Sequence, residues 1–220
     1  MKAIFLNCTL KKSPDVSNTE VLMRKVMALM EKKKVKCEMV RVVDYNVKYG
    51  VSSDEGDGDE WPIILKKIKQ ANIIIIGSPI WFGVRSSLCQ LIFERLDGTY
   101  AEGNKKNGQF PLYNKVGGVI VTGNEDGAHN VSANTLFNLS HLGCTIPPNC
   151  DCYYVGDAGP GPSYIEVGQC HQYTIKTAHL LVENTVFFAE LLKKNKIGTD
   201  LREIVKRSER EAGDCMRKKR

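Results

Sequence analysis

The sequence predicts a three-layer α/β/α domain built around a doubly wound parallel sheet of five strands. Apolar runs and helical patterns alternate five times along the chain, which is typical of parallel strands joined by helical crossovers. The apolar runs are continuous and do not alternate with polar residues, as expected for strands that are buried on both faces. Such sheets bind ligands beyond the carboxyl ends of their strands, so the loops that follow the strands are where function is expected.

Each predicted element has its own signal in the sequence. The strand candidates are the apolar runs at 2–8, 36–45, 72–80, 115–123 and 150–156. The helix candidates span 18–34, 60–70, 85–96, 132–142 and 173–194. Asp59 as a cap and Pro62 in the first turn mark the start of the second helix. Leu88, Ile92 and Leu96 share one face of the third helix, as the helical period requires.

Composition places the chain among ordinary globular proteins. It has 220 residues, of which 42% are hydrophobic and 25% are charged, which is ample for one packed core. No segment approaches the roughly 18 apolar residues of a membrane span, and the apolar start is too short for a signal peptide. The eight cysteines include no C-x-x-C pair, so reduced thiols are favoured over a zinc or iron–sulfur site. We therefore expect a cytoplasmic protein with no membrane partner and no metal.

The positive net charge comes from one end of the chain. Residues 193–220 contain eleven Lys or Arg and five Asp or Glu, which accounts for the whole net charge of +6. A nucleic-acid-binding protein combines a basic patch with a recognisable binding motif, and this sequence shows no such motif. We expect no nucleic-acid partner, a domain over residues 1–195, and a basic C-terminal extension over 196–220 that forms a solvated helix.

The segment after the first strand, residues 9–20, reads TLKKSPDVSNTE and is rich in hydroxyl and amide groups. It matches neither the Walker A nor the G-x-G-x-x-G pattern. It ends where a helix begins, so free N–H groups and the helix dipole would favour an anion, and Lys11 and Lys12 add positive charge. Ser17 and Glu20 also fit a capping box, which alone would explain them. Both interpretations can hold together.

Two aromatic residues follow the third strand in the stretch GSPIWFG, residues 77–83. Trp81 and Phe82 could cover the sheet edge as core residues. They could also belong to a protein interface, where tryptophan is enriched. The third interpretation is that they stand beside a flat aromatic ligand.

The segment after the fourth strand, residues 122–130, reads TGNEDGAHN and is more polar than a connector needs. An Asx-type turn that caps the next helix is one explanation. The other is that backbone and amide groups face the polar edge of a planar heterocycle. A single ligand with an anionic phosphate and a flat ring would use all three segments, and flavin mononucleotide (FMN) has this shape.

Four stretches carry a resemblance to a known family: residues 17–19, 78–98, 122–149 and 155–164. Over residues 2–179 the chain resembles the NAD(P)H-dependent FMN reductase branch of the flavodoxin-like superfamily. The resemblance implies a phosphate site formed by Thr9, Lys11, Ser17, Asn18 and Thr19. It implies that the flavin ring contacts Pro79, Ile80, Trp81, Phe82 and Gly83 on one side and Thr122, Gly123, Asn124, Glu125, Asp126 and Gly127 on the other.

The expected function is electron transfer from NADH or NADPH, through bound FMN, to a small acceptor such as a quinone or a flavin. His129 could donate a proton to the acceptor or simply lie on the surface, and Tyr164 could line the mouth of the site. The insertion at residues 100–115 could form a lid or a subunit contact. A homo-oligomer, dimer or tetramer, is the expected assembly. The alternatives are an electron carrier without substrate turnover and a flavin-free signalling or scaffold domain.

Overall fold

The computed structural model describes residues 1–157, 159 and 161–218. Five parallel strands form a sheet in the order β2-β1-β3-β5-β6, with a short sixth strand, β4, paired antiparallel to β3. The strands are β1 (Lys2–Asn7), β2 (Lys36–Arg41), β3 (Ile73–Trp81), β4 (Val84–Arg85), β5 (Val116–Gly123) and β6 (Asp151–Val155). The helices are α1 (Asn18–Lys32), α2 (Trp61–Gln70), α3 (Ser87–Asp97), α4 (Ala128–His141), α5 (Gln172–Lys194) and α6 (Leu201–Lys218).

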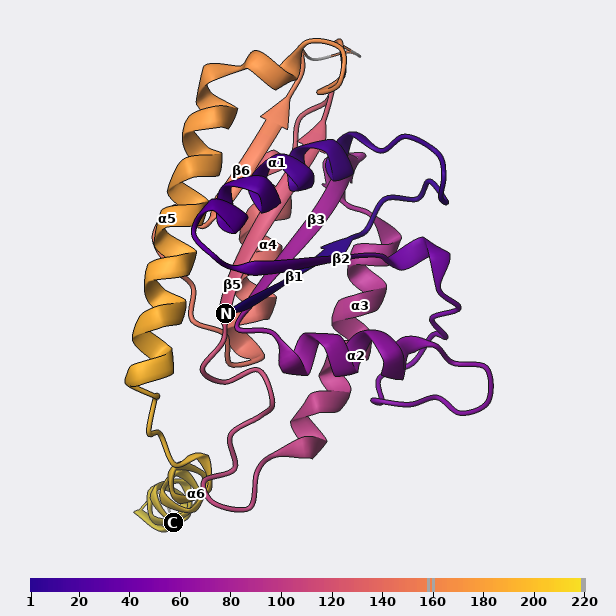
Figure 1. Cartoon of the computed structure of the whole chain (residues 1–220). Coiled ribbons are helices and arrows are strands. Elements are labelled where there is room, and N and C mark those ends of the chain that lie inside the picture. The colour runs from indigo at the N-terminus through magenta and orange to yellow at the C-terminus, as the bar shows by residue number, and fades with distance from the viewer. Residues whose placement is uncertain (158, 160, 219–220) are drawn as a thin grey trace.

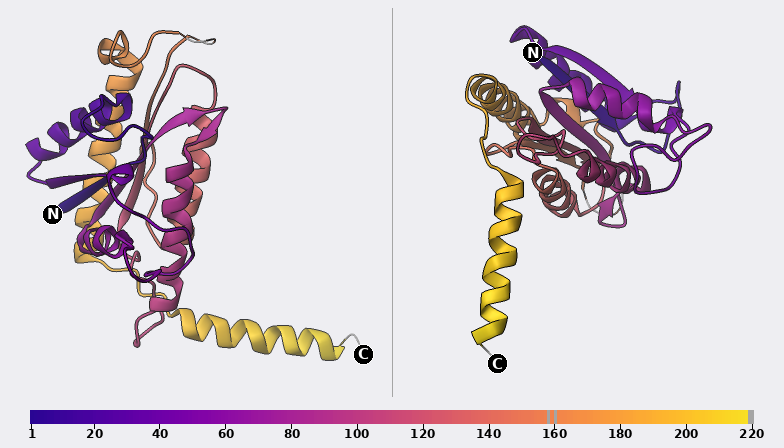
Figure 2. Two further views of the ribbon diagram at one scale, coloured as in Figure 1. Left: turned by 90° about the vertical axis from the view of Figure 1, so that its right-hand side faces the viewer. Right: turned by 90° about the horizontal axis from the view of Figure 1, so that it is seen from below.

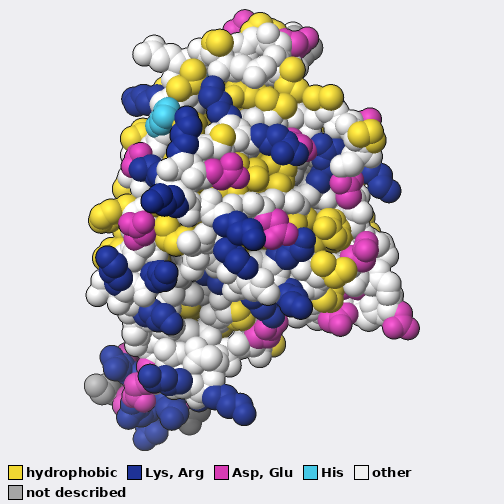
Figure 3. Space-filling view, viewed as in Figure 1, with side chains coloured by type: hydrophobic (Ala, Val, Ile, Leu, Met, Phe, Trp, Pro, Cys, Tyr) yellow, Lys and Arg dark blue, Asp and Glu magenta, His cyan; other side chains and the backbone are white. Residues whose placement is uncertain are grey.

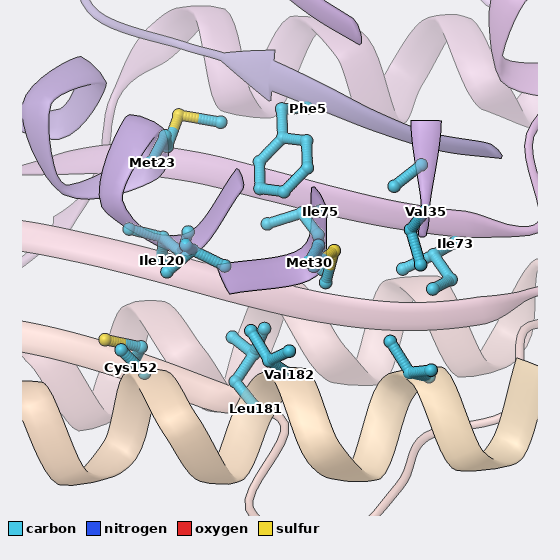
Figure 4. Close-up of a cluster of buried hydrophobic side chains, with 14 of the residues drawn as sticks. Phe5, Met23, Met30, Val35, Ile73, Ile75, Ile120, Cys152, Leu181 and Val182 are labelled. Atoms are coloured by element: carbon cyan, nitrogen blue, oxygen red, sulfur yellow. The ribbon is translucent and has the colours of Figure 1, made fainter. Parts of the chain in front are cut away.

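The sheet separates two layers of helices, as Figures 1 and 2 show. Helices α1 and α5 cover one face, and α2, α3 and α4 cover the other. Phe5, Ile75 and Ile120 point toward α1 and α5 (Figure 4), whereas Ile4 and Ile74 belong to the opposite core. Successive residues of one strand thus enter different cores, which explains why the strands are apolar throughout. The predicted fold class is confirmed.

Element boundaries differ from the sequence prediction mainly at the edge where the strands end. Strand β2 stops at Arg41 because the next three residues turn into a 3₁₀ helix, Val42–Asp44. Strand β3 continues through Pro79 to Trp81 instead of ending before the aromatic pair. Helix α3 starts only after Ser86, whose hydroxyl accepts the N–H of Cys89 at 3.2 Å. Helix α4 begins at Ala128, four residues before its predicted start, after a glycine that offers no side-chain cap.

The insertion at residues 100–115 lies between the end of α3 and the start of β5, at the amino edge of the sheet. It is therefore at the opposite edge from the strand ends, and the expectation that it forms a lid over the site is wrong. The insertion instead contacts the segment that leads into α6. Gln109 donates to the carbonyls of Ile197 and Thr199 at 2.8 and 2.9 Å, and the N–H of Leu201 donates to Asn107 at 2.8 Å.

Helix α6 projects from the body of the protein (Figure 2). Figure 3 shows Lys and Arg side chains interspersed with Asp and Glu both on this helix and on the visible face of the body. The last two residues of the predicted 196–220 extension lie outside the described residues. Among the described helices, none has the length and apolar character needed to cross a membrane. Nor does the described part of the chain bring together three His, Cys, Asp or Glu side chains that could hold a metal ion.

Candidate functional site

A cavity of about 400 Å³ opens at the carboxyl edge of the sheet. Four segments line it: the loop after β1 with the start of α1, the end of β3, the end of β5, and a loop before α5. The lining residues are Thr9, Leu10, Lys11, Ser17, Asn18, Thr19, Pro79, Ile80, Trp81, Phe82, Thr122, Gly123, Asn124, Glu125, Ser163 and Tyr164. The structure thus brings together nearly all residues that the sequence analysis selected from three separate loops.

The first loop, residues 9–17, leads into the amino end of α1. Ser17 is extended and its hydroxyl accepts the N–H of Glu20 at 3.2 Å, so the predicted cap is present. The carboxylate of Glu20 pairs with Arg24 and Arg41, so the capping box is only half formed. The first N–H groups of a helix have no partner inside the helix, which leaves those of Asn18 and Thr19 for a ligand in the cavity.

Arg41, the last residue of β2, and Asp44, in the 3₁₀ helix that follows it, hold the first loop in place. Arg41 donates to the carbonyls of Lys11 and Asp15 and pairs with Glu20. Asp44 accepts the N–H and the hydroxyl of Ser13 at 2.9 and 2.6 Å. Burial alone would raise the pKa of Glu20, but hydrogen bonds from Arg41 and Arg24 outweigh it and lower the pKa. Slight burial would likewise raise the pKa of Asp44, but the two hydrogen bonds from Ser13 outweigh it and lower the pKa.

The second segment is a tight hairpin rather than a loose loop. Trp81 pairs with Val84, so only Phe82 and Gly83 form the turn, and both have positive φ, 50° and 76°. Two such residues make the type I′ turn that suits the twist of a hairpin. Trp81 and Phe82 are 49% and 92% exposed. The interpretation of these aromatics as core residues is therefore wrong, and a ligand or protein contact remains.

The third loop, residues 122–127, packs against this hairpin tip. Glu125 accepts the N–H of Phe82 at 2.8 Å, and the amide of Asn130 donates to the carbonyl of Gly83 at 2.9 Å. A Cβ at Gly127 would come within 2.5 Å of that same carbonyl oxygen. Only glycine therefore permits this close approach of the two backbones.

The floor of the cavity joins the first and third loops. The hydroxyls of Thr19 and Thr122 are 2.7 Å apart and buried. Thr122 is the second-last residue of β5 and pairs with Pro79 of β3, so the contact lies close to the carboxyl ends of two neighbouring parallel strands. This hydrogen bond connects the start of α1 to the centre of the sheet edge.

Three of the residues predicted to contact the flavin do not line the main cavity, and neither does His129. Gly83, Asp126 and Gly127 border an adjoining open hollow with His129 and Asn130, and the two spaces share Phe82 and Glu125. Asp126 is exposed and its carboxylate accepts the N–H of Gly127 at 2.6 Å. The ring of His129 bonds the hydroxyl of Tyr153 at 2.9 Å, and Tyr153 in turn donates to Tyr173 at 3.3 Å.

A fourth wall, Ser163 and Tyr164, comes from a loop far along the chain. Asn18 accepts the N–H of Ile165 at 2.8 Å, and the amide of Asn124 donates to Gly161 at 3.2 Å, so two site residues fasten this loop. Ala158 and Pro160 of the same loop lie outside the described residues.

Tyr164 is buried rather than placed at the mouth. Its ring packs against Tyr154, with centroids 5.5 Å apart, and burial raises its pKa to about 12. Sequence reasoning missed Leu10 and Ser163. Leu10 could have been found, since it stands between two selected residues. Ser163 lies in a stretch that carried the resemblance, but nothing local indicated that it faces the cavity.

The residues present fit FMN. A phosphate requires an anion site, which the free N–H groups, hydroxyls and Lys11 at the amino end of α1 supply. A flat ring requires an apolar or aromatic wall, which Pro79, Ile80 and Trp81 supply. Its polar edge requires hydrogen-bonding groups, which the backbone after Thr122 supplies. The volume lies within the roughly 300–1,000 Å³ of cofactor pockets.

The fold and this cavity define a flavodoxin-like α/β domain with its site at the carboxyl edge of the sheet. Comparison with protein families gives the narrower assignment. Residues 1–155 match the model of the NADPH-dependent FMN reductases, and the chain belongs to this family. The resemblance seen in the sequence motifs is thereby confirmed.

Individual relatives give further detail. The chain is 39% identical to 8-demethyl-8-aminoriboflavin-5'-phosphate synthase of Streptomyces davaonensis, over 97% of this chain and 87% of that protein. It superposes on a crystal structure of RosB with the bound intermediate 8-demethyl-8-formylriboflavin-5'-phosphate, with a TM-score of 0.90, 39% identity, and coverage of 96% and 87% of the two chains. A flavone reductase structure matches with a TM-score of 0.65 and 13% identity over 91% and 67% of the chains, which shows a shared fold.

Proposed function

We propose that the protein is an FMN-dependent oxidoreductase that passes electrons from NADH or NADPH to a small-molecule acceptor. The observation that carries the proposal is the cavity itself, which joins a helix N-terminus, an aromatic hairpin and a polar loop at one sheet edge. Membership of the FMN reductase family supports it. When bound, FMN would supply the redox chemistry, taking up two electrons from the reduced nicotinamide and releasing them to the acceptor.

The chain's own residues would bind and orient the cofactor. Asn18 and Thr19 would hold the phosphate with backbone N–H groups, and Ser17 and Thr9 would add hydroxyls. Lys11 would balance the negative charge from the solvent side. The Thr19–Thr122 hydrogen bond would fix the phosphate side relative to the ring side, since it joins the two loops at 2.7 Å.

On the ring side, apolar side chains and backbone groups rather than charged side chains would bind the cofactor. Pro79, Ile80 and Trp81 would form one wall, and the peptide groups of Gly123 and Asn124 would face the polar edge. Phe82 is so exposed that it would contact the second substrate rather than enclose the cofactor. His129 borders the adjoining hollow, within reach of an acceptor held there.

A second candidate is an enzyme that modifies riboflavin 5'-phosphate itself. The observation that favours it is the 39% identity, over nearly the whole chain, to a synthase that makes an aminoriboflavin phosphate. In that case the same cavity would bind FMN as a substrate. An electron carrier is less well supported, because carriers of this fold usually present an acidic docking face, and residues 1–192 contain twenty acidic and twenty basic residues.

The test is spectroscopic. Purified protein loaded with FMN is mixed with NADH or NADPH without oxygen, and the visible spectrum is recorded before and after a quinone is added. Bleaching followed by recovery of the yellow colour is the expected result. Colour that never bleaches would favour the carrier, and failure to bind FMN would favour the scaffold. A separate incubation with FMN, oxygen and an amine donor, followed by mass spectrometry of the flavin, detects the second candidate as a change in the mass of FMN.

We further propose that the assembly is a homo-oligomer formed through α4. The sequence from Ala128 to His141 contains no Asp, Glu, Lys or Arg, although its outer face is exposed and Phe137 is 61% accessible. Interface cores are depleted in charged residues, and an uncharged face can meet its own copy without repulsion. Light scattering coupled to size-exclusion chromatography measures the mass in solution, and a monomer would refute this assembly.

A further inference from the structure

Arg41 connects the end of β2 to a loop that lies about 30 residues earlier in the chain. Its side chain is 10% exposed, which is low for an arginine outside the core. One terminal nitrogen donates to the carbonyls of Lys11 and Asp15, at 3.2 and 2.9 Å. The other pairs with the carboxylate of Glu20. One guanidinium therefore contacts the first loop at two points, Lys11 and Asp15, and also contacts Glu20 in the first turn of α1.

These contacts fix which way two peptide groups face. In a trans peptide the carbonyl and the following N–H point in opposite directions. Because the carbonyls of Lys11 and Asp15 point at Arg41, the N–H groups of Lys12 and Val16 point away from it. A loop held in this way turns its carbonyl oxygens, which repel anions, toward the guanidinium. The lining of the cavity, as far as the structure describes it, includes Lys11 and Ser17 on either side of this stretch but not Arg41.

Arg41 also compensates a charge that opposes anion binding. Glu20 stands in the first turn of α1, where its carboxylate would repel a phosphate at the same helix end. Pairing with Arg41 and Arg24 offsets that charge. Asp44 holds the loop from the other side through Ser13, so the middle of the loop is fastened on both sides.

We propose that Arg41 is a positioning residue for the phosphate subsite, acting through the first loop and Glu20 without touching the ligand. This inference rests on the proposed FMN site. It predicts that loss of Arg41 weakens the binding of FMN but spares that of riboflavin, which has the same ring and no phosphate. A purely structural role would weaken both ligands equally.

Arg24 provides a matched control. It bonds the same carboxylate, with its Nε 2.8 Å from Glu20, but within the described residues it makes no hydrogen bond to the first loop. Its side chain is 65% exposed. The comparison of Arg41→Gln with Arg24→Gln therefore separates the contact with the loop from the removal of one positive charge near Glu20.

The experiment titrates full-length apoprotein with FMN and with riboflavin and follows the quenching of flavin fluorescence. We expect Arg41→Gln to raise the Kd for FMN by about tenfold or more, and the Kd for riboflavin by less than about threefold, since charge-assisted contacts are lost only on the phosphate side. Arg24→Gln should change both by less than about threefold. Arg41→Lys should give an intermediate loss for FMN, because one ammonium cannot serve both carbonyls and the carboxylate.

Equal weakening of both ligands by Arg41→Gln would overturn the inference, and so would unchanged binding of FMN. If Arg41→Gln does not fold, Arg41→Lys decides by the same ratio of the two dissociation constants. The proposed function fails in a different way: wild-type protein that binds riboflavin as tightly as FMN would have no phosphate subsite at all.

Discussion

On its first-loop side the candidate site is held by charged side chains from the end of β2 and the 3₁₀ helix after it, whereas on its hairpin side it is held by backbone turns and close packing. Arg41 and Asp44 fasten the first loop through hydrogen bonds with its backbone and Ser13. The hairpin tip depends on positive φ angles and on contact between Gly127 and Gly83. A charged anchor can be changed without altering the sheet, but a packed turn cannot. Changes to the charged anchors of the first loop should therefore affect the phosphate alone, and changes to the hairpin tip should affect every flavin.

Gly127→Ala should have the largest effect. Its φ is 127°, and a Cβ there would lie 2.5 Å from the carbonyl oxygen of Gly83. This oxygen belongs to the backbone, so it cannot move away without distorting the hairpin. We expect affinity for both FMN and riboflavin to fall by about tenfold or more, with a loss of about 1–3 kcal/mol in unfolding free energy. Isothermal titration and urea denaturation measure the two effects. Gly213→Ala in α6 has open space around it and is the control. Normal binding by Gly127→Ala would show that the two loops do not need this close approach.

Asn18→Asp should separate the two sides of the site. The aspartate keeps an oxygen to accept the N–H of Ile165, and a negative charge in the first turn suits the helix dipole, so folding should be unaffected. The same charge would repel a phosphate. We expect FMN to bind about tenfold more weakly or worse, and riboflavin to change by less than about threefold. Fluorescence titration gives the dissociation constants for FMN and riboflavin. If the variant and the wild type bind FMN equally well, the phosphate does not bind at this helix end.

The double change Asn18→Ala with Thr19→Ala separates the phosphate side from the ring side less clearly. It removes the oxygen that accepts the N–H of Ile165 and the hydroxyl that bonds Thr122. Both the fourth wall and the cavity floor would therefore loosen, and riboflavin would lose affinity together with FMN. The single Asn18→Asp change avoids this ambiguity.

Glu125→Ala should have a moderate effect on both ligands. The carboxylate accepts the N–H of Phe82, and an unmade hydrogen bond of this kind costs about 1 kcal/mol, or about fivefold in affinity. Glu125→Gln keeps an acceptor for the same N–H and should bind flavins within about twofold of the wild type. Calorimetric titration of both variants measures the difference. If Glu125→Gln binds flavins as weakly as Glu125→Ala does, the negative charge of Glu125 matters and the hydrogen bond does not.

Asp126→Asn should have the smallest effect. The carboxylate is exposed, borders the adjoining hollow, and accepts the N–H of Gly127. Removing its charge should raise the reduction potential of bound FMN, because a nearby carboxylate disfavours an anionic reduced flavin, but solvent screening keeps the change small. We expect a rise below about 30 mV, equivalent to about 1.4 kcal/mol for two electrons. Spectroelectrochemical titration measures it. A larger rise would place this carboxylate beside the ring.

The sequence was sufficient for the sheet and for most of the cavity because these depend on simple rules. Continuous apolar runs such as 73–76 identify strands buried on both faces. Parallel strands end at one edge, so polar loops that follow them must meet there, and the Thr19–Thr122 contact shows that they do. The Ser17 cap was visible because its S-x-x-E spacing is local.

What could not be predicted depends on contacts between distant residues or on unusual turns. The hairpin at Phe82 and Gly83 lacks the Asn-Gly or Asp-Gly pair that usually marks a type I′ turn, so the sequence predicts a strand that stops at Ile80, one residue before its observed end. Nothing near Arg41 indicates that it holds a loop about 30 residues away. The same is true of Ser163, whose loop is fastened by Asn18 from the other end of the chain.

The projecting helix α6 is a suitable place to attach the protein to a surface or a dye. Its Cys215 is exposed, and apart from Cys170 the other described cysteines are buried or half-buried. An 18-residue helix is about 27 Å long, and α6 leaves the molecule at the amino edge, away from the cavity. After Cys170→Ser, a thiol-reactive electrode linker on Cys215 would therefore leave the mouth of the site open to substrates.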